Sequence, residues 1–360
     1  MTGKGDIARM RLRNQGIDDP RFTSPHAVVS WFGGMQAQDY LAALWAVGLR
    51  MKKAVETDIE RALAEKKIVR SWPLRGTLHF VAAEDLKWML ELLAPRVIAR
   101  NAARLKREFE LDGSTLRRCR TVLIRALQGG RQLTRGEFYG ALDRARIRTT
   151  ASRGLHIIFA LAHEGLICFG PRRAKQQTLV LLDEWAPSST DLKGDAALHE
   201  LARRYFASHS PATVADFAWW SGLPAAEAKR AAEMSGAHRK QKRAAIPKPS
   251  AWLLPAFDEY LVGYKDRSAV IDPKHAKRVN AGGGLLNPTI VVDGEVVGTW
   301  KRIMKMDGVR IIPSLFRPLK KHRSGSSDAE ERYAAFVSGK KVHAVDFRNP
   351  HSTTGWRKKK

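Results

Sequence analysis

The chain has 360 residues, with 63 Lys and Arg against 36 Asp and Glu, and its formal net charge is +27. Hydrophobic residues make up 44%, which argues against a disordered chain, and the length predicts more than one domain. The sequence has no run of about 18 apolar residues, so no transmembrane helix is expected, and the charge favours a polyanionic partner.

Location and redox state follow from the N-terminus and the cysteines. The first residues, MTGKGDIARMRLRNQG, lack the apolar stretch of a secretory signal. The only cysteines, Cys119 and Cys168, lack metal-ligand spacing and give little scope for disulfides. We therefore expect a cytoplasmic, nucleoid-associated protein that binds nucleic acid. An arginine-rich genome or a ribosome-associated role is the alternative explanation of the charge.

The first helix signals surround a pair of glutamines. Ser24 and Pro25 are typical of an N-cap and a first helical residue, and the apolar pattern after them ends at glycines 33–34. Asp39 can cap the following helix. Gln36 and Gln38 fall in the connector, where residues two apart point the same way if the chain is extended. The pattern favours two carboxamides directed at one place.

The next segments predict winged helices. A helix at about 57–66 precedes the stretch IVRSWPLRGTLHFV, which reads as two strands around a turn and so completes a winged helix. A similar order recurs from residue 133, and a third helix-turn-helix turns at 222–224. The stretch PTIVVDGEVVGTWKRIM predicts a hairpin turning at Asp293 and Gly294.

The expected fold is α+β, with tandem winged-helix (helix-turn-helix) domains followed by a C-terminal β-rich domain. The expected divisions are a first winged helix at 1–110, a second at 111–185, a third at 196–250, a β-rich domain at 251–347 and a basic tail at 348–360.

Five motifs, in this order along the chain, are similar to those of a known family. They are QAQD at 36–39, RSWPLRGTLHFV at 70–81, RRYFASHSPATVADFAWWSGL at 203–223, LLPAFDEYLVGYKDRS at 253–268 and VVDGEVVGTW at 291–300. The chain resembles the winged-helix DNA-binding family of the bacterial DNA glycosylases AlkZ and YcaQ, and its Gln-x-Gln motif is of the AlkZ type. Ser210 departs from the His-Gly-Pro that the family pattern predicts. The resemblance implies tandem winged helices around a DNA channel, with Gln36 and Gln38 at the reaction site.

The chemistry of a carboxamide pair suits one class of substrate. An amide does not titrate near neutral pH, so Gln36 and Gln38 cannot be general bases. A purine alkylated on a ring nitrogen is already cationic and leaves readily, so the enzyme mainly has to place water behind C1′ and stabilise an oxocarbenium-like sugar. A role in capping or bracing the loop is the alternative. No lysine lies near the pair in sequence, which disfavours a Schiff-base mechanism.

Basic residues predict contacts with DNA. Arg75, Thr77 and His79 can lie on one face of the first wing, for contact with phosphate or deoxyribose or for a network within the wing. A stripe at helical spacing and a basic turn in the third wing could track phosphates or be merely solvated. The stripe consists of Arg96, Arg100, Arg104 and Arg107, and the turn contains Arg239, Lys240, Lys242 and Arg243. The C-terminal WRKKK is expected to add non-specific affinity.

Two further groups are interpreted as structural. Asp258, Tyr260, Asp266 and Arg267 are expected to join the β-rich domain to the winged helices, although a metal site or a second catalytic carboxylate pair is the alternative. Trp219 and Trp220 are expected in the core rather than as a base-stacking platform. Neither a Walker-type loop nor a deaminase zinc motif appears, and no metal or cofactor is expected.

These observations favour a monofunctional DNA glycosylase. The expected enzyme is a monomer that removes N7- or N3-alkylated purines, bulky or cross-linked ones included, from double-stranded DNA and leaves an abasic site. A non-catalytic winged-helix regulator or chromosome-structuring protein is the main alternative, and an RNA-associated protein is the third. A regulator is usually a symmetric dimer, whereas unlike winged helices in one chain suit a monomer around a duplex.

Overall fold

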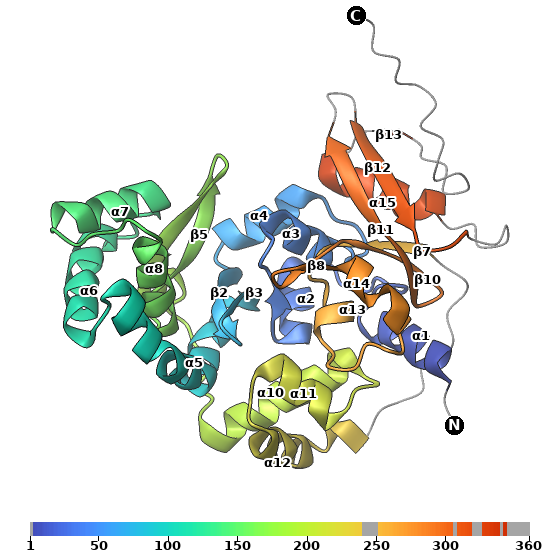
Figure 1. Cartoon of the computed structure of the whole chain (residues 1–360), viewed down its shortest axis with the longest axis horizontal. Coiled ribbons are helices and arrows are strands. Elements are labelled where there is room, and N and C mark those ends of the chain that lie inside the picture. The colour runs from blue at the N-terminus through green and yellow to red at the C-terminus, as the bar shows by residue number, and fades with distance from the viewer. Residues whose placement is uncertain (1–2, 240–250, 305–307, 319–325, 339–340, 344–360) are drawn as a thin grey trace, which may run out of the picture.

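The structure is a computed structural model, and it describes residues 3–239, 251–304, 308–318, 326–338 and 341–343. In Figure 1 the second winged helix forms a lobe at one side, the third lies below, and the β-rich region packs beside the first. The expected class, winged helices followed by a C-terminal β-rich region, is confirmed.

The first winged helix comprises four helices and three strands. They are α1 (Lys4–Asn14), α2 (Pro25–Phe32), β1 (Met35–Gln36), α3 (Tyr40–Gly48), α4 (Glu56–Ala64), β2 (Ile68–Leu74) and β3 (Thr77–Ala82). The Ser24 side chain caps α2 by accepting from the Ala27 N–H, and Asp39 caps α3 by accepting from the Ala42 N–H. Both predicted caps are confirmed.

The second winged helix follows a long connecting helix. Its elements, with that connection, are η1 (Ala83–Asp85), α5 (Leu86–Phe109), α6 (Gly113–Leu127), β4 (Leu133–Thr134), α7 (Arg135–Arg144), α8 (Arg153–His163), β5 (Ile167–Arg173), β6 (Gln176–Leu181) and α9 (Leu182–Trp185). A six-stranded sheet in the order β1-β3-β2-β5-β6-β4 joins the first two winged helices through the pairing of Arg70 with Phe169.

The third winged helix and the β-rich region complete the described chain. The third unit comprises α10 (Gly194–His209), α11 (Val214–Ser221), α12 (Ala225–Ser235) and η2 (Ala237–Arg239). The β-rich region comprises β7 (Ala251–Leu254), α13 (Glu259–Val262), η3 (Pro273–His275), α14 (Ala276–Val279), β8 (Asn280–Gly282), β9 (Leu285–Leu286), β10 (Thr289–Val292), β11 (Glu295–Met304), β12 (Gly308–Leu315), α15 (Ser326–Ser338) and β13 (Lys341–His343). Asp293 and Gly294 form the predicted turn between β10 and β11, both with positive φ.

The buried cores connect segments that lie far apart in sequence. One core contains α2, α3 and α4 together with β7, β10 and α15, so the first winged helix and the β-rich region share a hydrophobic interior. A second core combines the first half of α5 with α10 to α12. A third belongs mainly to the second winged helix. The domain boundaries drawn from the sequence stay a prediction. The connector at residues 33–39 contributes to the core that the first winged helix shares with the β-rich region.

Candidate functional site

The two glutamines lie on a short edge strand. Gly33 ends α2 with a φ of 74°, which a residue with a side chain rarely adopts, and the chain then enters β1. Gln36 pairs with His79 on β3, and the Ala37 N–H donates to the Leu78 carbonyl at 2.6 Å. This pairing fixes the Gln-x-Gln segment to the hairpin of β2 and β3.

Both carboxamides contact this hairpin through their oxygen atoms. Gln36 is 9% exposed, and its Oε1 accepts a hydrogen bond from Arg75 at 3.2 Å. Gln38 is exposed, and its Oε1 accepts from the Leu78 N–H at 3.3 Å. Neither amide nitrogen donates a hydrogen bond to any residue that the structure describes. The two oxygens are therefore held by the protein, and the two N–H₂ groups are available to another molecule.

Arg70 holds the same segment in place by hydrogen bonds to its backbone, a role that sequence reasoning missed. Its guanidinium donates to the Ala37 carbonyl at 3.0 and 2.8 Å and to the Gln177 side chain at 3.3 Å. Burial lowers the pKa of Arg70 to about 10, so the group stays charged at neutral pH. The only sequence signal was an arginine inside a strand that is buried along its whole length.

The predicted shared face of Arg75, Thr77 and His79 is wrong. Arg75 lies in the turn between β2 and β3 with a φ of 54°, so the alternation of a strand does not include it. The Thr77 hydroxyl donates to the Leu74 carbonyl at 3.2 Å. His79 is 0% exposed, which leaves it no direct contact with phosphate or deoxyribose. Arg75 instead bridges Gln36 and the Trp220 carbonyl.

His79 is a neutral imidazole next to Gln36. Burial and the neighbouring Arg75 guanidinium lower the pKa of His79 to about 4. Its Nδ1–H donates to the Thr77 carbonyl at 2.8 Å, whereas the buried Nε2 has no partner among the described residues. A group with this pKa cannot donate a proton to a leaving base at neutral pH.

The free energy of unfolding is expected to fall by about 3 kcal/mol between pH 6.5 and 4 because of His79 alone. In that window the unfolded chain protonates His79 while the folded chain, with a pKa of about 4, does not, so lower pH favours unfolding. Urea denaturation at several pH values measures this dependence. His79→Gln should flatten it, whereas removal of the exposed His199 should not. Equal slopes in all three proteins would contradict the assignment.

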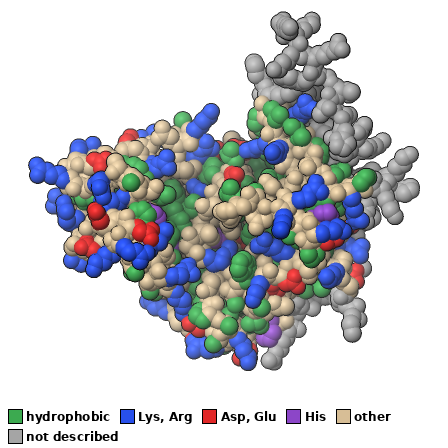
Figure 2. Space-filling view, in the orientation of Figure 1, with side chains coloured by type: hydrophobic (Ala, Val, Ile, Leu, Met, Phe, Trp, Pro, Cys, Tyr) green, Lys and Arg blue, Asp and Glu red, His purple; other side chains and the backbone are tan. Residues whose placement is uncertain are grey.

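The arginine stripe on α5 is exposed along its length. Arg96 pairs with Glu227, and both Arg104 and Arg107 lie within ion-pair distance of Glu108. Arg100 has no ion pair within the described ranges. Figure 2 shows Lys and Arg side chains spread over this face of the molecule, on the second winged-helix lobe and beyond it. The Arg239 side chain, Lys240, Lys242, Arg243 and the tail at 348–360 lie outside the described residues.

The acidic segment at the start of α13 links several units. The Asp258 carboxylate receives two hydrogen bonds from Arg50 at 2.9 Å, and the Tyr260 hydroxyl donates to the carbonyls of Ala8 and Gly294 at 3.1 and 2.6 Å. Asp266 joins the third winged helix only through its backbone, because its N–H donates to the Asp216 carboxylate at 3.2 Å, whereas its own exposed carboxylate accepts from Ser268 and not from a winged helix among the described residues. Arg267 makes one long bond, 3.4 Å, to the Tyr264 carbonyl.

Glu259 lies between Asp258 and Tyr260 in the sequence, and its side chain contacts the glutamine segment. Its carboxylate is 1% exposed and accepts hydrogen bonds from the Gln36 N–H at 2.8 Å and the Trp220 indole N–H at 3.1 Å. Sequence reasoning did not assign Glu259 to the site. Trp220 is buried as expected, but Trp219 is 46% exposed, so the expectation of a core position is wrong for Trp219.

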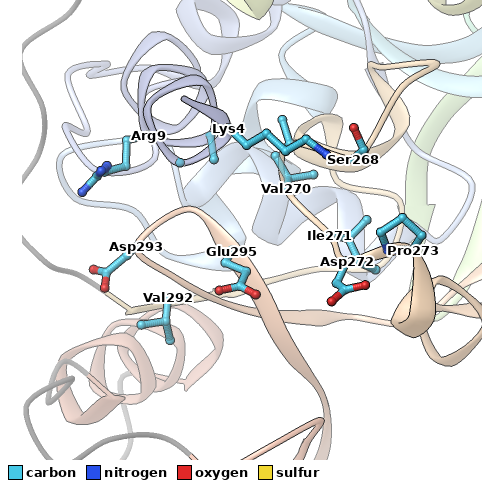
Figure 3. Close-up of a pocket in the computed structure, with 13 residues that line it drawn as sticks. Lys4, Arg9, Ser268, Val270, Ile271, Asp272, Pro273, Val292, Asp293 and Glu295 are labelled. Atoms are coloured by element: carbon cyan, nitrogen blue, oxygen red, sulfur yellow. The ribbon is translucent and has the colours of Figure 1, made fainter. Parts of the chain in front are cut away.

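Other features of the structure do not involve the glutamines. A pocket of about 580 Å³ lies between α1 and residues 268–273, and its lining includes Lys4 and Arg9, with Lys4 extending toward Ser268, and the acidic residues Asp272, Asp293 and Glu295 (Figure 3). In the described ranges no three His, Cys, Asp or Glu side chains are grouped to hold a metal ion. Among the same residues, no helix combines the length and apolar character needed to cross a bilayer.

A family model and two known proteins match this chain. The family model described as DNA glycosylase AlkZ-like matches residues 29–336. A relative from Streptomyces sahachiroi, named interstrand DNA cross-link repair glycosylase, is 25% identical in an alignment of 325 residues that covers 81% of this chain and 85% of the relative. The solved structure of Streptomyces sahachiroi DNA glycosylase AlkZ superposes with a TM-score of 0.75 at 21% identity, and covers 95% of this chain and 99% of that chain. The structural similarity shows a common fold.

Proposed function

Since the chain belongs to the AlkZ-like DNA glycosylase family and is an enzyme of that class, we propose that it excises N7- or N3-alkylated purines from double-stranded DNA and leaves an abasic site. Its substrates include bulky adducts and purines held in interstrand cross-links. The relative from Streptomyces sahachiroi, whose name refers to such cross-links, supports this range. The enzyme acts as a monomer, since the tandem winged helices lie in one chain.

The proposed substrate class rests on one observation, the pair of carboxamides whose oxygens are hydrogen-bonded to the protein. Gln36 and Gln38 each have a fixed oxygen and an amide nitrogen without a partner among the described residues. His79 beside them is neutral because its pKa is about 4. Such groups orient a water and a sugar but do not protonate a leaving base. A purine that is already cationic does not need that proton.

The reaction proposed for this site uses the amides for orientation. The bond between C1′ and the base nitrogen breaks, and its electron pair neutralises the cationic purine, which leaves. Water adds its oxygen to C1′ and releases a proton to solvent. Each carboxamide oxygen accepts one hydrogen bond from the protein and keeps a second lone pair, with which it orients this water and stabilises the oxocarbenium-like sugar. Gln38, the exposed member, is the one that substrate reaches first.

Release of 7-methylguanine from an end-labelled duplex under single-turnover conditions tests the proposal. The wild-type protein is expected to generate alkali-cleavable abasic sites in a methylated duplex and none in the same duplex without methylation. A duplex with a guanine–guanine N7 cross-link tests the wider range, and appearance of single-stranded products would support it. Duplex binding without base release from either substrate would contradict the proposed substrate class.

We also propose that the α5 stripe follows the phosphate backbone. All four arginines of the stripe are exposed, and Arg100 is free of ion pairs within the described chain. Each phosphate contact contributes about 0.9 to the slope of log affinity against log salt concentration. The salt dependence of duplex binding should therefore be weaker for Arg100→Ala than for wild type, and an unchanged slope would remove Arg100 from the contact surface.

A further inference from the structure

Glu259 is held entirely by segments outside its own helix. It begins α13 in the β-rich region and is 1% exposed, yet its carboxylate accepts hydrogen bonds from the first and third winged helices. Oε1 accepts from the Gln36 N–H at 2.8 Å, and Oε2 accepts from Trp220 Nε1 at 3.1 Å and lies 3.3 Å from His209 Nε2. Three donors therefore converge on the two oxygens of one buried carboxylate.

The direction of the Gln36 N–H explains why an outside acceptor is needed. In an antiparallel pair, successive N–H groups point alternately toward and away from the partner strand. The Ala37 N–H donates to β3, so the Gln36 N–H faces away from β3 at the edge of the sheet. A buried N–H without an acceptor is costly. The Glu259 carboxylate takes the place that a neighbouring strand would occupy.

Glu259 is also linked to the Gln36 side chain by hydrogen bonds through Trp220 and Arg75. The Trp220 indole donates to Glu259, while the Trp220 carbonyl accepts a hydrogen bond from Arg75. Arg75 also donates to Gln36 Oε1 at 3.2 Å. Gln36, Arg75, Trp220 and Glu259 thus form a closed ring of contacts. Glu259 holds the Gln36 backbone directly and its carboxamide through Trp220 and Arg75.

The charges within this ring favour an ionised Glu259. Burial alone would raise the pKa of the carboxyl, but the hydrogen bonds from the His209 ring and the Gln36 N–H bring it below its ordinary value. Burial lowers the pKa of His209, so its ring is neutral at neutral pH and donates from Nε2. The nearby Glu259 charge raises the pKa of buried Arg75 against the larger effect of its burial. The carboxylate contacts the backbone of Gln36 and the guanidinium contacts its side chain, and the two charges compensate each other.

We propose that Glu259 is a positioning residue for base excision: its buried carboxylate sets the location of Gln36 against the substrate by holding the Gln36 N–H and the Trp220–Arg75 bridge. This inference rests on the proposed function, because it assumes that Gln36 takes part in the reaction. Glu259 does not touch the substrate itself. Glu259 affects the rate of base release through Gln36, so replacing the Gln36 side chain should also abolish the effect of Glu259.

Glu259→Gln is the decisive variant because it keeps the shape and removes the charge. A carboxamide has one accepting oxygen, so at least one of the three donors must face an N–H₂ group. We expect the single-turnover rate constant for 7-methylguanine release to fall about 100-fold at saturating enzyme, as for a small displacement of a reacting group. The enzyme concentration for half-maximal rate should change less than about twofold, because the phosphate contacts lie elsewhere.

Tyr260→Phe is the matched control on the same helix. It removes a buried hydroxyl that donates to Ala8 and Gly294, but no contact to Gln36. It should lower the melting temperature and leave the rate constant of the folded protein unchanged. If Glu259→Gln does not fold, Trp220→Phe removes the indole donor together with part of a buried ring, keeps the backbone carbonyl that accepts from Arg75, and should slow release about tenfold.

The double variant Gln36→Ala plus Glu259→Gln separates positioning from a general structural role. If Glu259 acts through Gln36, Glu259→Gln should slow the Gln36→Ala protein less than about threefold. An equal loss in both backgrounds would overturn the inference, and so would a folded Glu259→Gln protein within about threefold of the wild-type rate. No base release by the wild type would overturn the proposed function, and with it this role of Glu259. An active wild type with an unaffected Glu259→Gln variant overturns the positioning role alone.

Discussion

Replacing Gln36 and Gln38 together by alanine is expected to lower the rate constant of 7-methylguanine release by about 1,000-fold or more. Loss of one preorganised polar group at a reacting centre costs about 100- to 1,000-fold, and this variant removes two. Gln36 is held by Arg75 and Gln38 by the Leu78 N–H, so both amides are oriented before substrate arrives. Single-turnover release from an end-labelled duplex, with enzyme in excess, measures the effect.

Two comparisons show whether the loss belongs to catalysis. Duplex affinity of the double variant should stay within about threefold of wild type, because the exposed arginines supply most of the attraction to DNA. Gln128→Ala, which changes an exposed glutamine at the end of α6, should leave both rate and affinity unchanged. A double variant that retains a tenth or more of the wild-type rate would exclude the glutamine pair as the reaction site.

The predictable parts of the fold depend on short-range signals. The Ser24 and Asp39 caps, the turn at Asp293 and the helix end at Gly222 each follow from a few neighbouring residues, and all appear in the structure. The hairpin of β2 and β3 was predicted, but the prediction did not allow for the left-handed Arg75 in its turn. One residue outside the strand alternation was enough to make the predicted face wrong.

The surroundings of the glutamines could not be predicted from local signals. Gln36 and Glu259 are 223 positions apart, and the Arg75 contact with Trp220 spans 145. No periodic pattern in the sequence predicts these contacts, because they depend on how the three winged helices and the β-rich region share their hydrophobic cores. Arg70 illustrates the same difficulty, since a charged residue in a strand is usually read as exposed. Its actual partners are carbonyl oxygens of the glutamine segment.

The buried pair of Arg50 and Asp258 underlies this arrangement, and its loss is expected to have the largest effect on stability. Both side chains are 0% exposed and joined by two hydrogen bonds of 2.9 Å. Asp258→Asn would leave the guanidinium buried without an anion, which costs about 3–5 kcal/mol. Urea denaturation should show this decrease in the free energy of unfolding, a large part of the roughly 5–15 kcal/mol typical of a folded domain.

Two further variants separate loss of the buried pair from loss of an acidic side chain in general. Asp266→Asn changes an exposed carboxylate in the same segment and should alter the free energy of unfolding by about 0.5 kcal/mol or less. Combining Asp258→Asn with Arg50→Met removes the unpaired charge, so part of the lost stability should return. A stability of Asp258→Asn within about 1 kcal/mol of wild type would mean that water or another group compensates Arg50. Because Asp258 directly precedes Glu259, the pair also fixes the start of α13, and Asp258→Asn should slow base release even under conditions where the protein remains folded.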